Sequence, residues 1–166
     1  MLVVFDLDGT LIRSFLREGQ RHAFDDVEVL PGRVRALLEL RRRGVKLAVA
    51  TNQGGVAHGY QTQQQVWEKV ARVRRALWQP ELPVFASFSH PDRPRVPLEK
   101  PPGRLDFPRI DPLARKPGPG LIFGAIQHHR TVRQATVMVG DMDTDREAAD
   151  AAGVEYLDVA AFFDAS

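Results

Sequence analysis

The sequence predicts an α/β fold, a parallel sheet covered by helices on both faces, and three observations support this. Short apolar runs alternate with helical patterns along the 166 residues. Such alternation is typical of parallel strands joined by helical crossovers. Polar residues directly follow three of the runs, at the end of a parallel strand where ligands bind in these folds. At this length the chain is expected to form one domain, residues 1–166.

The strands are predicted from short apolar runs that end in polar residues or glycine, as buried parallel strands do. The first run, residues 2–5, is followed at once by an acidic pair. A proline interrupts the third run and makes it the weakest. The five predicted strands are residues 2–5, 45–50, 82–88, 135–139 and 154–159.

Four segments have the spacing of amphipathic helices. In residues 31–44 apolar side chains recur on one face, and Gly44 is expected to end the helix. Residues 62–78 carry a second stripe, of Val66, Val70 and Val73. The other two helices are expected over residues 120–129, behind prolines, and over residues 144–152.

Two segments do not fit this alternation. Residues 12–30 form a polar and aromatic excursion, and residues 89–115 are rich in proline. A loop of the second length in a compact domain is usually functional or mobile. We interpret residues 89–115 as a flap near the site, with a solvated disordered loop as the alternative.

Composition excludes several classes of protein. The chain has no cysteine, which rules out disulfides, a thiolate zinc site and a cysteine nucleophile. No stretch approaches the ~20 apolar residues of a membrane span, and the first residues lack a signal-peptide pattern. The net charge of +2 is too small to indicate nucleic-acid binding by itself. A cytoplasmic location is expected.

Polar side chains follow three predicted strands at the point where each ends. Asp6 and Asp8 come after the first strand, Thr51 and Asn52 after the second, and Asp141 after the fourth. Because the carboxyl ends of parallel strands meet at one edge of a sheet, these groups are expected to lie close together. The sequence thus predicts a single site at that edge.

The acidic groups of this edge predict a bound cation. Asp6 and Asp8 are two residues apart and project to the same face. Two such charges ~4 Å apart repel by about 4 kcal/mol at an effective dielectric near 20. Asp141 adds to that cost. Mg²⁺ is the best candidate because it prefers carboxylate, water and phosphate oxygens; calcium and zinc fit the residue types less well.

A metal ion beside two carboxylates suits phosphoryl transfer. One carboxylate can attack phosphorus, and the other can protonate the leaving oxygen and later activate water. Positioned donors stabilise the charge on the phosphoryl oxygens, and Thr51, Asn52 and Lys116 are the candidates. Taken singly, Thr51 could instead be a strand-end cap and Lys116 a surface lysine.

Four motifs together resemble the haloacid dehalogenase (HAD) superfamily of phosphatases: FDLDGT, VATNQGG, RKPGPG and VGDMDTD, in that order. The resemblance implies a Rossmann-like sheet of strand order 3-2-1-4-5. It also implies that Asp6 is the nucleophile and Asp8 the general acid/base. By the same resemblance, Thr51 and Lys116 bind the phosphoryl group. Mg²⁺ is bound by Asp6, Asp141 and the Asp8 main-chain carbonyl. Asp145 supports Asp141 from behind.

The TNQ and RKPGPG sequences resemble a narrower group, subgroup IIIA, which includes histidinol-phosphatases, heptose-bisphosphate phosphatases and polynucleotide 3′-phosphatases. This implies that Arg115 helps to read the substrate. Members with a Cys/His zinc loop carry it just before the RKP motif, where this chain has one His and no Cys. No insertion is large enough for a cap domain, so an open, capless site is expected.

The leading hypothesis is a Mg²⁺-dependent phosphatase for a small phosphorylated metabolite, such as a sugar phosphate or a compound like histidinol phosphate. The alternative enzyme is a 3′-phosphatase acting on nucleic-acid ends. Two hypotheses without catalysis are a receiver-like module that accepts phosphate as a signal and a silent phosphate-binding scaffold. The sequence shows neither the oligomeric state nor a protein partner.

Overall fold

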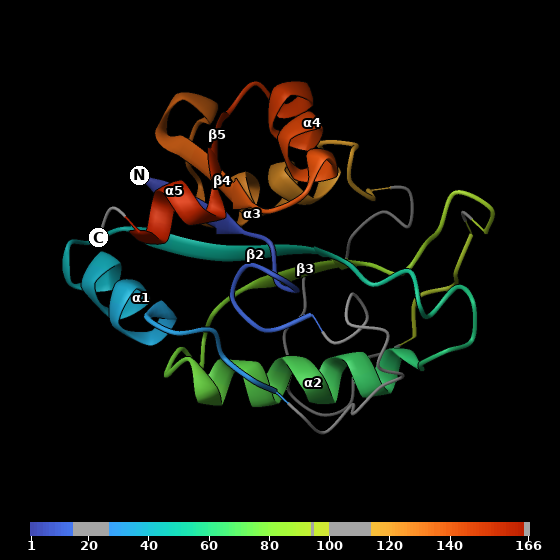
Figure 1. Cartoon of the computed structure of the whole chain (residues 1–166). Coiled ribbons are helices and arrows are strands. Elements are labelled where there is room, and N and C mark those ends of the chain that lie inside the picture. The colour runs from blue at the N-terminus through green and yellow to red at the C-terminus, as the bar shows by residue number, and fades with distance from the viewer. Residues whose placement is uncertain (15–26, 94, 100–113, 165–166) are drawn as a thin grey trace.

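The computed structural model describes residues 1–14, 27–93, 95–99 and 114–164, and Figure 1 shows its arrangement. Its strands form one five-stranded sheet in the order β3-β2-β1-β4-β5, and every pairing is parallel. The predicted fold class and strand order are confirmed. The strands are β1 (Leu2–Phe5), β2 (Lys46–Asn52), β3 (Val84–Ser87), β4 (Thr136–Gly140) and β5 (Glu155–Asp158).

The central strand, β1, has both faces covered. Its side chains alternate between the faces, so Val3 and Phe5 join one apolar cluster while Leu2 and Val4 join the other. All four are fully buried. A strand buried on both sides needs a continuous apolar run, which is why LVVF was recognisable in the sequence.

Helices cover the two faces of the sheet in separate sets (Figure 1). Side chains of α1 and α2 join the cluster that contains Phe5, and those of α3 and α4 join the cluster that contains Val4. Each face is thereby shielded from water, as a parallel sheet requires. The helices are α1 (Arg33–Arg42), α2 (Gln63–Ala76), α3 (Gly120–His129), α4 (Asp143–Ala152) and α5 (Val159–Asp164).

Thr62 and Gln65 form a capping box that starts α2. The Thr62 hydroxyl accepts from the Gln65 backbone N–H at 3.1 Å, and the Gln65 side chain accepts from the Thr62 N–H at 2.8 Å. This reciprocal capping box satisfies two N–H groups that would otherwise lack helical partners. It fixes where α2 begins, and so which of its side chains face the sheet.

The end of the chain differs from prediction. The fifth strand stops at Asp158, and the chain then forms α5, which the sequence analysis did not predict. Two phenylalanines of this short helix, Phe162 and Phe163, lie against Phe5 with ring centroids 5.6 and 6.0 Å apart. A six-residue helix has too few turns for a clear period, so this ring packing determines it. The third strand also ends one residue earlier than predicted, at Ser87.

Parts of the two irregular segments lie outside the described residues. This applies to residues 15–26 of the first, and to residue 94 and residues 100–113 of the proline-rich segment that we predicted to be a flap. Within the part of the chain that is described, no helix is both long and apolar enough to cross a membrane.

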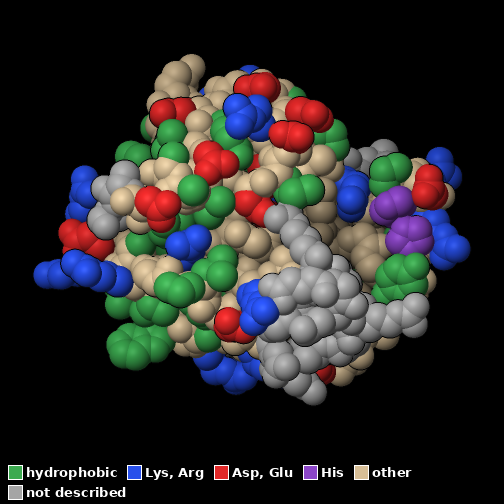
Figure 2. All heavy atoms as spheres, viewed as in Figure 1, with side chains coloured by type: hydrophobic (Ala, Val, Ile, Leu, Met, Phe, Trp, Pro, Cys, Tyr) green, Lys and Arg blue, Asp and Glu red, His purple; other side chains and the backbone are tan. Residues whose placement is uncertain are grey.

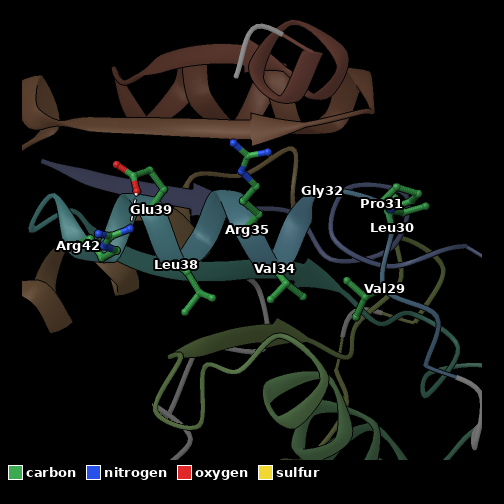
Figure 3. A pocket seen from close by; sticks show the side chains of 9 residues that line it. All are labelled: Val29, Leu30, Pro31, Gly32, Val34, Arg35, Leu38, Glu39 and Arg42. Atoms are coloured by element: carbon green, nitrogen blue, oxygen red, sulfur yellow. Dashed lines mark hydrogen bonds and ion pairs between the residues drawn. The ribbon is translucent and has the colours of Figure 1, made fainter.

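A groove of about 900 Å³ lies beside α1, and Figure 3 shows the side chains that line it. Val34 and Leu38 border it from the helix, and Val29 borders it from the preceding segment. None of the predicted site residues lines this groove.

Two neighbouring leucines of α1 provide a test of this packing. Leu37 is fully buried, whereas Leu38 is partly exposed at the groove. We expect Leu37→Ala to lower the free energy of unfolding by about 2–5 kcal/mol, because it leaves a cavity in the core. Leu38→Ala, the matched control in the same helix, should cost clearly less. Urea denaturation of both variants measures this, and equal losses would contradict the assigned orientation of α1.

Candidate active site

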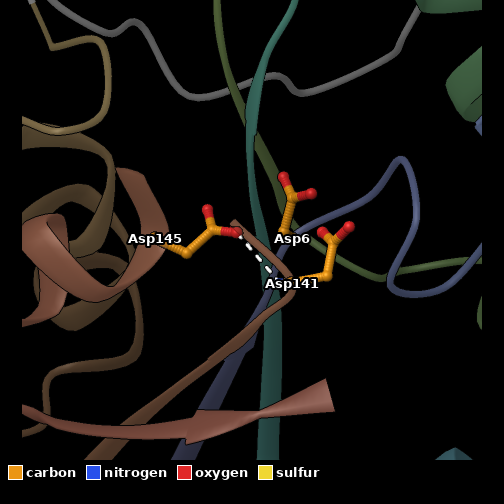
Figure 4. Close-up of side chains that lie close together, drawn as sticks. All are labelled: Asp6, Asp141 and Asp145. Carbon is orange, nitrogen blue, oxygen red and sulfur yellow. Dashed lines mark hydrogen bonds between the residues drawn. The ribbon is translucent and has the colours of Figure 1, made fainter. Parts of the chain in front are cut away.

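Three carboxylates from two strand ends and one helix converge at the edge of the sheet (Figure 4). Asp6 follows β1, Asp141 follows β4, and Asp145 lies in the first turn of α4. Each offers an oxygen within 4.8 Å of the others. The backbone N–H of Asp6 donates to the Val139 carbonyl at 2.9 Å, which ties the start of this cluster to β4. The predicted meeting of strand ends is present.

The ammonium group of Lys116 lies between two of these carboxylates. Its Nζ donates to Asp6 Oδ1 at 2.6 Å, to Asp145 Oδ1 at 2.5 Å and to the Ala50 carbonyl at 2.8 Å. An ammonium has three N–H groups, so all three have partners. The residue is only 2% exposed. A buried lysine with this set of partners is held in place by the anions that it neutralises.

The charges of this pair depend on one another. Burial raises the pKa of Asp6 to about 7; Lys116 opposes this rise, and the neighbouring Asp145 adds to it. Burial alone would lower the pKa of Lys116, but Asp6 and Asp145 raise it above its ordinary value. Lys116 therefore remains charged at neutral pH. Asp6 would ionise more readily with another cation beside it, because opposite charge favours the carboxylate.

Asp145 connects Lys116 to the turn that carries Asp141. Its Oδ2 accepts from the backbone N–H groups of Asp141 and Met142, at 3.2 and 3.1 Å, while its Oδ1 accepts from Lys116. The residue that precedes this turn must be small, because a Cβ at Gly140 would overlap the Asp145 carboxylate. The geometry of the turn thus depends on a glycine that the sequence analysis did not single out.

Asp8 is not one of these three carboxylates and has its own partners. Gly9, with φ of 92°, turns the chain sharply just after it. Asp8 Oδ2 accepts from Gln53 Nε2 at 2.8 Å, and its Oδ1 accepts from Lys69 Nζ at 2.6 Å. Gln53 Nε2 also donates to the Thr51 hydroxyl at 2.9 Å. The two carboxylates of the FDLDGT motif are therefore held by different lysines.

Two residues predicted to bind phosphate have other contacts in this structure. The Asn52 amide bonds both main-chain polar groups of Lys116: Oδ1 accepts from its N–H at 3.0 Å, and Nδ2 donates to its carbonyl at 2.9 Å. Arg115 Nη1 donates to the Ser89 carbonyl at 2.8 Å. Asn52 thus fixes the backbone that carries Lys116, and the phosphate-binding roles of Asn52 and Arg115 stay predictions.

Three polar residues that were not predicted from the sequence contact the site. Thr10 donates its hydroxyl to Asp141 Oδ1 at 3.2 Å, and Gln53 and Lys69 bond Asp8. Thr10 and Gln53 stand inside the motifs that were quoted, so their positions were a usable signal. Lys69 is three residues after Val66, which places it on the same side of α2. The spacing from Val66 was therefore also a usable signal for Lys69.

A group of rings, of which Tyr60 is exposed and His58 and His90 are half-buried, lies on the loops that follow β2 and β3. His58 and His90 have ring centroids 4.3 Å apart, and His58 also stacks on Tyr60. Nearby, Arg93 donates to the Ala57 carbonyl at 3.0 Å. Figure 2 shows histidines beside basic and acidic groups at one side of this face. This ring group (His58, Tyr60 and His90) adjoins Arg115, because both His90 and the Arg115 guanidinium lie close to Gly54.

The charges at the sheet edge fit a divalent cation. Four carboxylates (Asp6, Asp8, Asp141 and Asp145) face two ammonium groups (Lys69 and Lys116), which leaves two negative charges when all are ionised. Both oxygens of Asp145 already accept hydrogen bonds, which favours Asp6 and Asp141 as the metal-binding pair. Oxygen ligands of this kind suit Mg²⁺.

This strand order and the acidic edge around a buried lysine define the class: a HAD superfamily phosphatase, an enzyme that hydrolyses phosphomonoesters. The chain belongs to the polynucleotide kinase 3 phosphatase family, whose model matches residues 1–163. The resemblance stated from the sequence motifs is thereby confirmed.

Curated relatives and solved structures agree with this. D-glycero-beta-D-manno-heptose-1,7-bisphosphate 7-phosphatase of Escherichia coli K12 is 30% identical over 152 residues, which cover 92% of this chain and 74% of the relative. Its Haemophilus influenzae counterpart is 27% identical, with 88% and 73% covered. D,D-heptose 1,7-bisphosphate phosphatase from B. bronchiseptica, crystallised with magnesium and phosphate, shares the fold with a TM-score of 0.72, 21% identity, and coverage of 99% and 96%.

Gly140 offers a test of how the site is held together. We expect Gly140→Ala to displace the Asp145 carboxylate, and with it the contacts to Lys116 and to the β4–α4 turn. Stability should fall by about 1–3 kcal/mol, as for other overpacked sites, and phosphatase turnover should fall at least about 10-fold.

Gly44→Ala is the control, because Gly44 has φ of 75° and precedes the start of β2, so an alanine there strains the backbone away from the site and should leave turnover near wild type. Urea denaturation and phosphate release measure the two effects. Wild-type stability and turnover in Gly140→Ala would show that the turn does not depend on this glycine.

Proposed function

We propose that this chain is a Mg²⁺-dependent phosphatase that removes phosphate from a small phosphorylated metabolite through an aspartyl phosphate on Asp6. The observation that carries the proposal is the pairing of Asp6 with buried Lys116 at the sheet edge, with Asp8 following two residues later. A carboxylate next to fixed positive charge is a suitable nucleophile for phosphorus, because the charge also stabilises the developing phosphoryl anion.

The two aspartates divide the chemistry. An oxygen of Asp6 attacks phosphorus, the bond from phosphorus to the ester oxygen breaks, and Asp8 gives its proton to that leaving oxygen. Water then attacks the phosphorus of the aspartyl phosphate. Asp8 takes a proton from this water, and the Asp6 carboxylate is regenerated as inorganic phosphate leaves. Each residue returns to its starting state.

Further groups of the chain act on the phosphoryl oxygens. The Thr51 hydroxyl, at the end of β2, is a donor to one of them. Lys116 uses all three N–H groups in this structure, so contact with a phosphoryl oxygen requires it to share or exchange one bond. Asp6, Asp141 and the Asp8 main-chain carbonyl would hold Mg²⁺. When bound there, Mg²⁺ would neutralise phosphoryl charge and allow two anions to approach.

The relatives favour a small substrate. The curated relatives are named for a heptose bisphosphate, a sugar phosphate, and they align with most of this chain. We therefore propose a sugar phosphate or a compound like histidinol phosphate as the substrate class. Arg115 is the residue that we propose to contact the part of the substrate beyond the phosphate, because it adjoins Lys116 and lies beside the ring group.

A second candidate function is removal of a 3′-phosphate from a nucleic-acid end. The description of the matching family supports it. The net charge of +2 does not indicate nucleic-acid binding by itself, but folding brings His58, Tyr60 and His90 together beside arginines. Aromatic rings that reach solvent beside cations are able to stack on bases, and Tyr60 is 65% exposed. This observation makes the second function worth testing against the first.

A substrate panel separates the two functions. We expect phosphate release from sugar phosphates or histidinol phosphate to exceed release from 3′-phosphorylated oligonucleotides by at least about 10-fold in kcat/KM. Activity should require added Mg²⁺ and disappear with EDTA. The control is the matching oligonucleotide with a 5′-phosphate. Preference for the 3′-phosphorylated end would favour the second function, and equal rates with EDTA would contradict the metal dependence.

Substitution of the nucleophile tests the mechanism. Asp6→Asn should reduce turnover by more than about 10³-fold, because an amide does not form the aspartyl phosphate. The fold should persist, since the change removes one buried charge among several. Asp143→Asn is the matched control: the same change in an exposed residue two positions from Asp141 should leave turnover near wild type. Phosphate release and circular dichroism measure both, and an active Asp6→Asn would refute the mechanism.

A further inference from the structure

Lys69 reaches the site from a helix far away in sequence. It lies on α2, between Val66 and Val70, whose side chains pack in the core. Its side chain is 18% exposed, and its Nζ lies 2.6 Å from Asp8 Oδ1. Exposed ion pairs contribute little, but a short and mostly buried pair restricts the orientation of both partners. Lys69 therefore acts on the direction in which the Asp8 carboxylate points.

The other Asp8 oxygen is fixed as well. Gln53 donates to Oδ2 at 2.8 Å, and Gln53 in turn accepts from Gln61 Nε2 at 3.2 Å. Both oxygens of Asp8 thus have a donor from outside its own strand end. The Asp8 side chain is 30% exposed, so without these donors it would be able to adopt other rotamers. Lys69 and Gln53 together define one orientation.

Two lysines pair with the two aspartates of the FDLDGT motif, one with each. Lys116 pairs with Asp6, and Lys69 pairs with Asp8. Lys46, by contrast, donates to the His129 carbonyl at an exposed position away from the site. This division has a chemical meaning, because the nucleophile and the acid/base must be held in different directions to act on opposite partners of the same phosphorus–oxygen bond.

We propose that Lys69 is a positioning residue for Asp8: its ammonium, with the Gln53 amide, holds the acid/base carboxylate where it meets the leaving oxygen. The proposal rests on the acid/base role of Asp8 in the proposed function. Lys69 contacts Asp8 rather than the substrate. The competing explanation is that Lys69 only ties α2 to the sheet. The two explanations differ in how strongly the loss of kcat/KM on replacing Lys69 depends on the leaving group of the substrate.

The test compares two esters. The leaving group of para-nitrophenyl phosphate departs without a proton, whereas that of β-glycerol phosphate needs one. In Lys69→Met we expect kcat/KM for β-glycerol phosphate to fall by about 10- to 100-fold, and kcat/KM for para-nitrophenyl phosphate to change less than about 3-fold. Lys69→Arg, which keeps a cationic donor, should recover part of the loss. Lys46→Met, the same change at the exposed lysine, should leave both values unchanged.

The outcomes that overturn the proposal are distinct. Equal losses on the two esters, together with a lower Tm, would show a structural role. Unchanged values on both esters would show no role. Should Lys69→Met fail to fold, Lys69→Gln, which is polar but lacks the ammonium, decides in its place, and an unaltered ratio of the two esters in that variant then overturns the proposal. Asp8→Asn is the reference: if it does not change the ester ratio, the acid/base assignment in the proposed function has failed instead.

Discussion

The buried ion pair of Lys116 with Asp6 and Asp145 is the interaction on which the site depends. Removing an ammonium from water is costly, and here three acceptors compensate for the lost hydration. The arrangement also overcomes the repulsion between neighbouring carboxylates, so acidic groups can gather without unfolding the sheet edge. Asn52 contributes by bonding the Lys116 main chain on both sides. The ammonium is therefore placed by its backbone as well as by its charge.

The strand order explains how a few residues are enough to build the site. With β1 at the centre of the sheet, its carboxyl end lies beside those of β2 and β4. Asp6 and Asp141 directly follow β1 and β4, and Thr51 is the next-to-last residue of β2, so all three reach the same edge of the sheet. The apolar parts of the strands are covered by helices on both faces, which leaves this edge as the natural place for polar chemistry. None of the site's carboxylates or lysines lines the groove beside α1.

Much of this was predictable from the sequence because strand ends and motif spacing are local features. The five strands, four of the helices and the convergence of Asp6 and Asp141 followed from them, whereas the place of Lys116 was implied by the family resemblance. The hydrogen-bond partners of the site's side chains were harder to predict from the sequence. Which donor Asp8 binds depends on how α2 packs, and Lys69 lies 61 residues away. Helix α5 was not predicted because ring packing on Phe5 stabilises it, and such a contact leaves no periodic pattern in the sequence.

The contacts of the site join distant parts of the chain. Asp6 and Lys116 are 110 residues apart, and Thr10 and Asp141 are 131 residues apart. Closing loops of that length is entropically costly, so these contacts form only when most of the sheet is already assembled. A partly synthesised polypeptide that stops before β4 would thus hold Asp6 without its neighbours from that strand. Turnover would then report that β4 has joined the sheet. Enzyme activity is therefore a probe of a late step in folding.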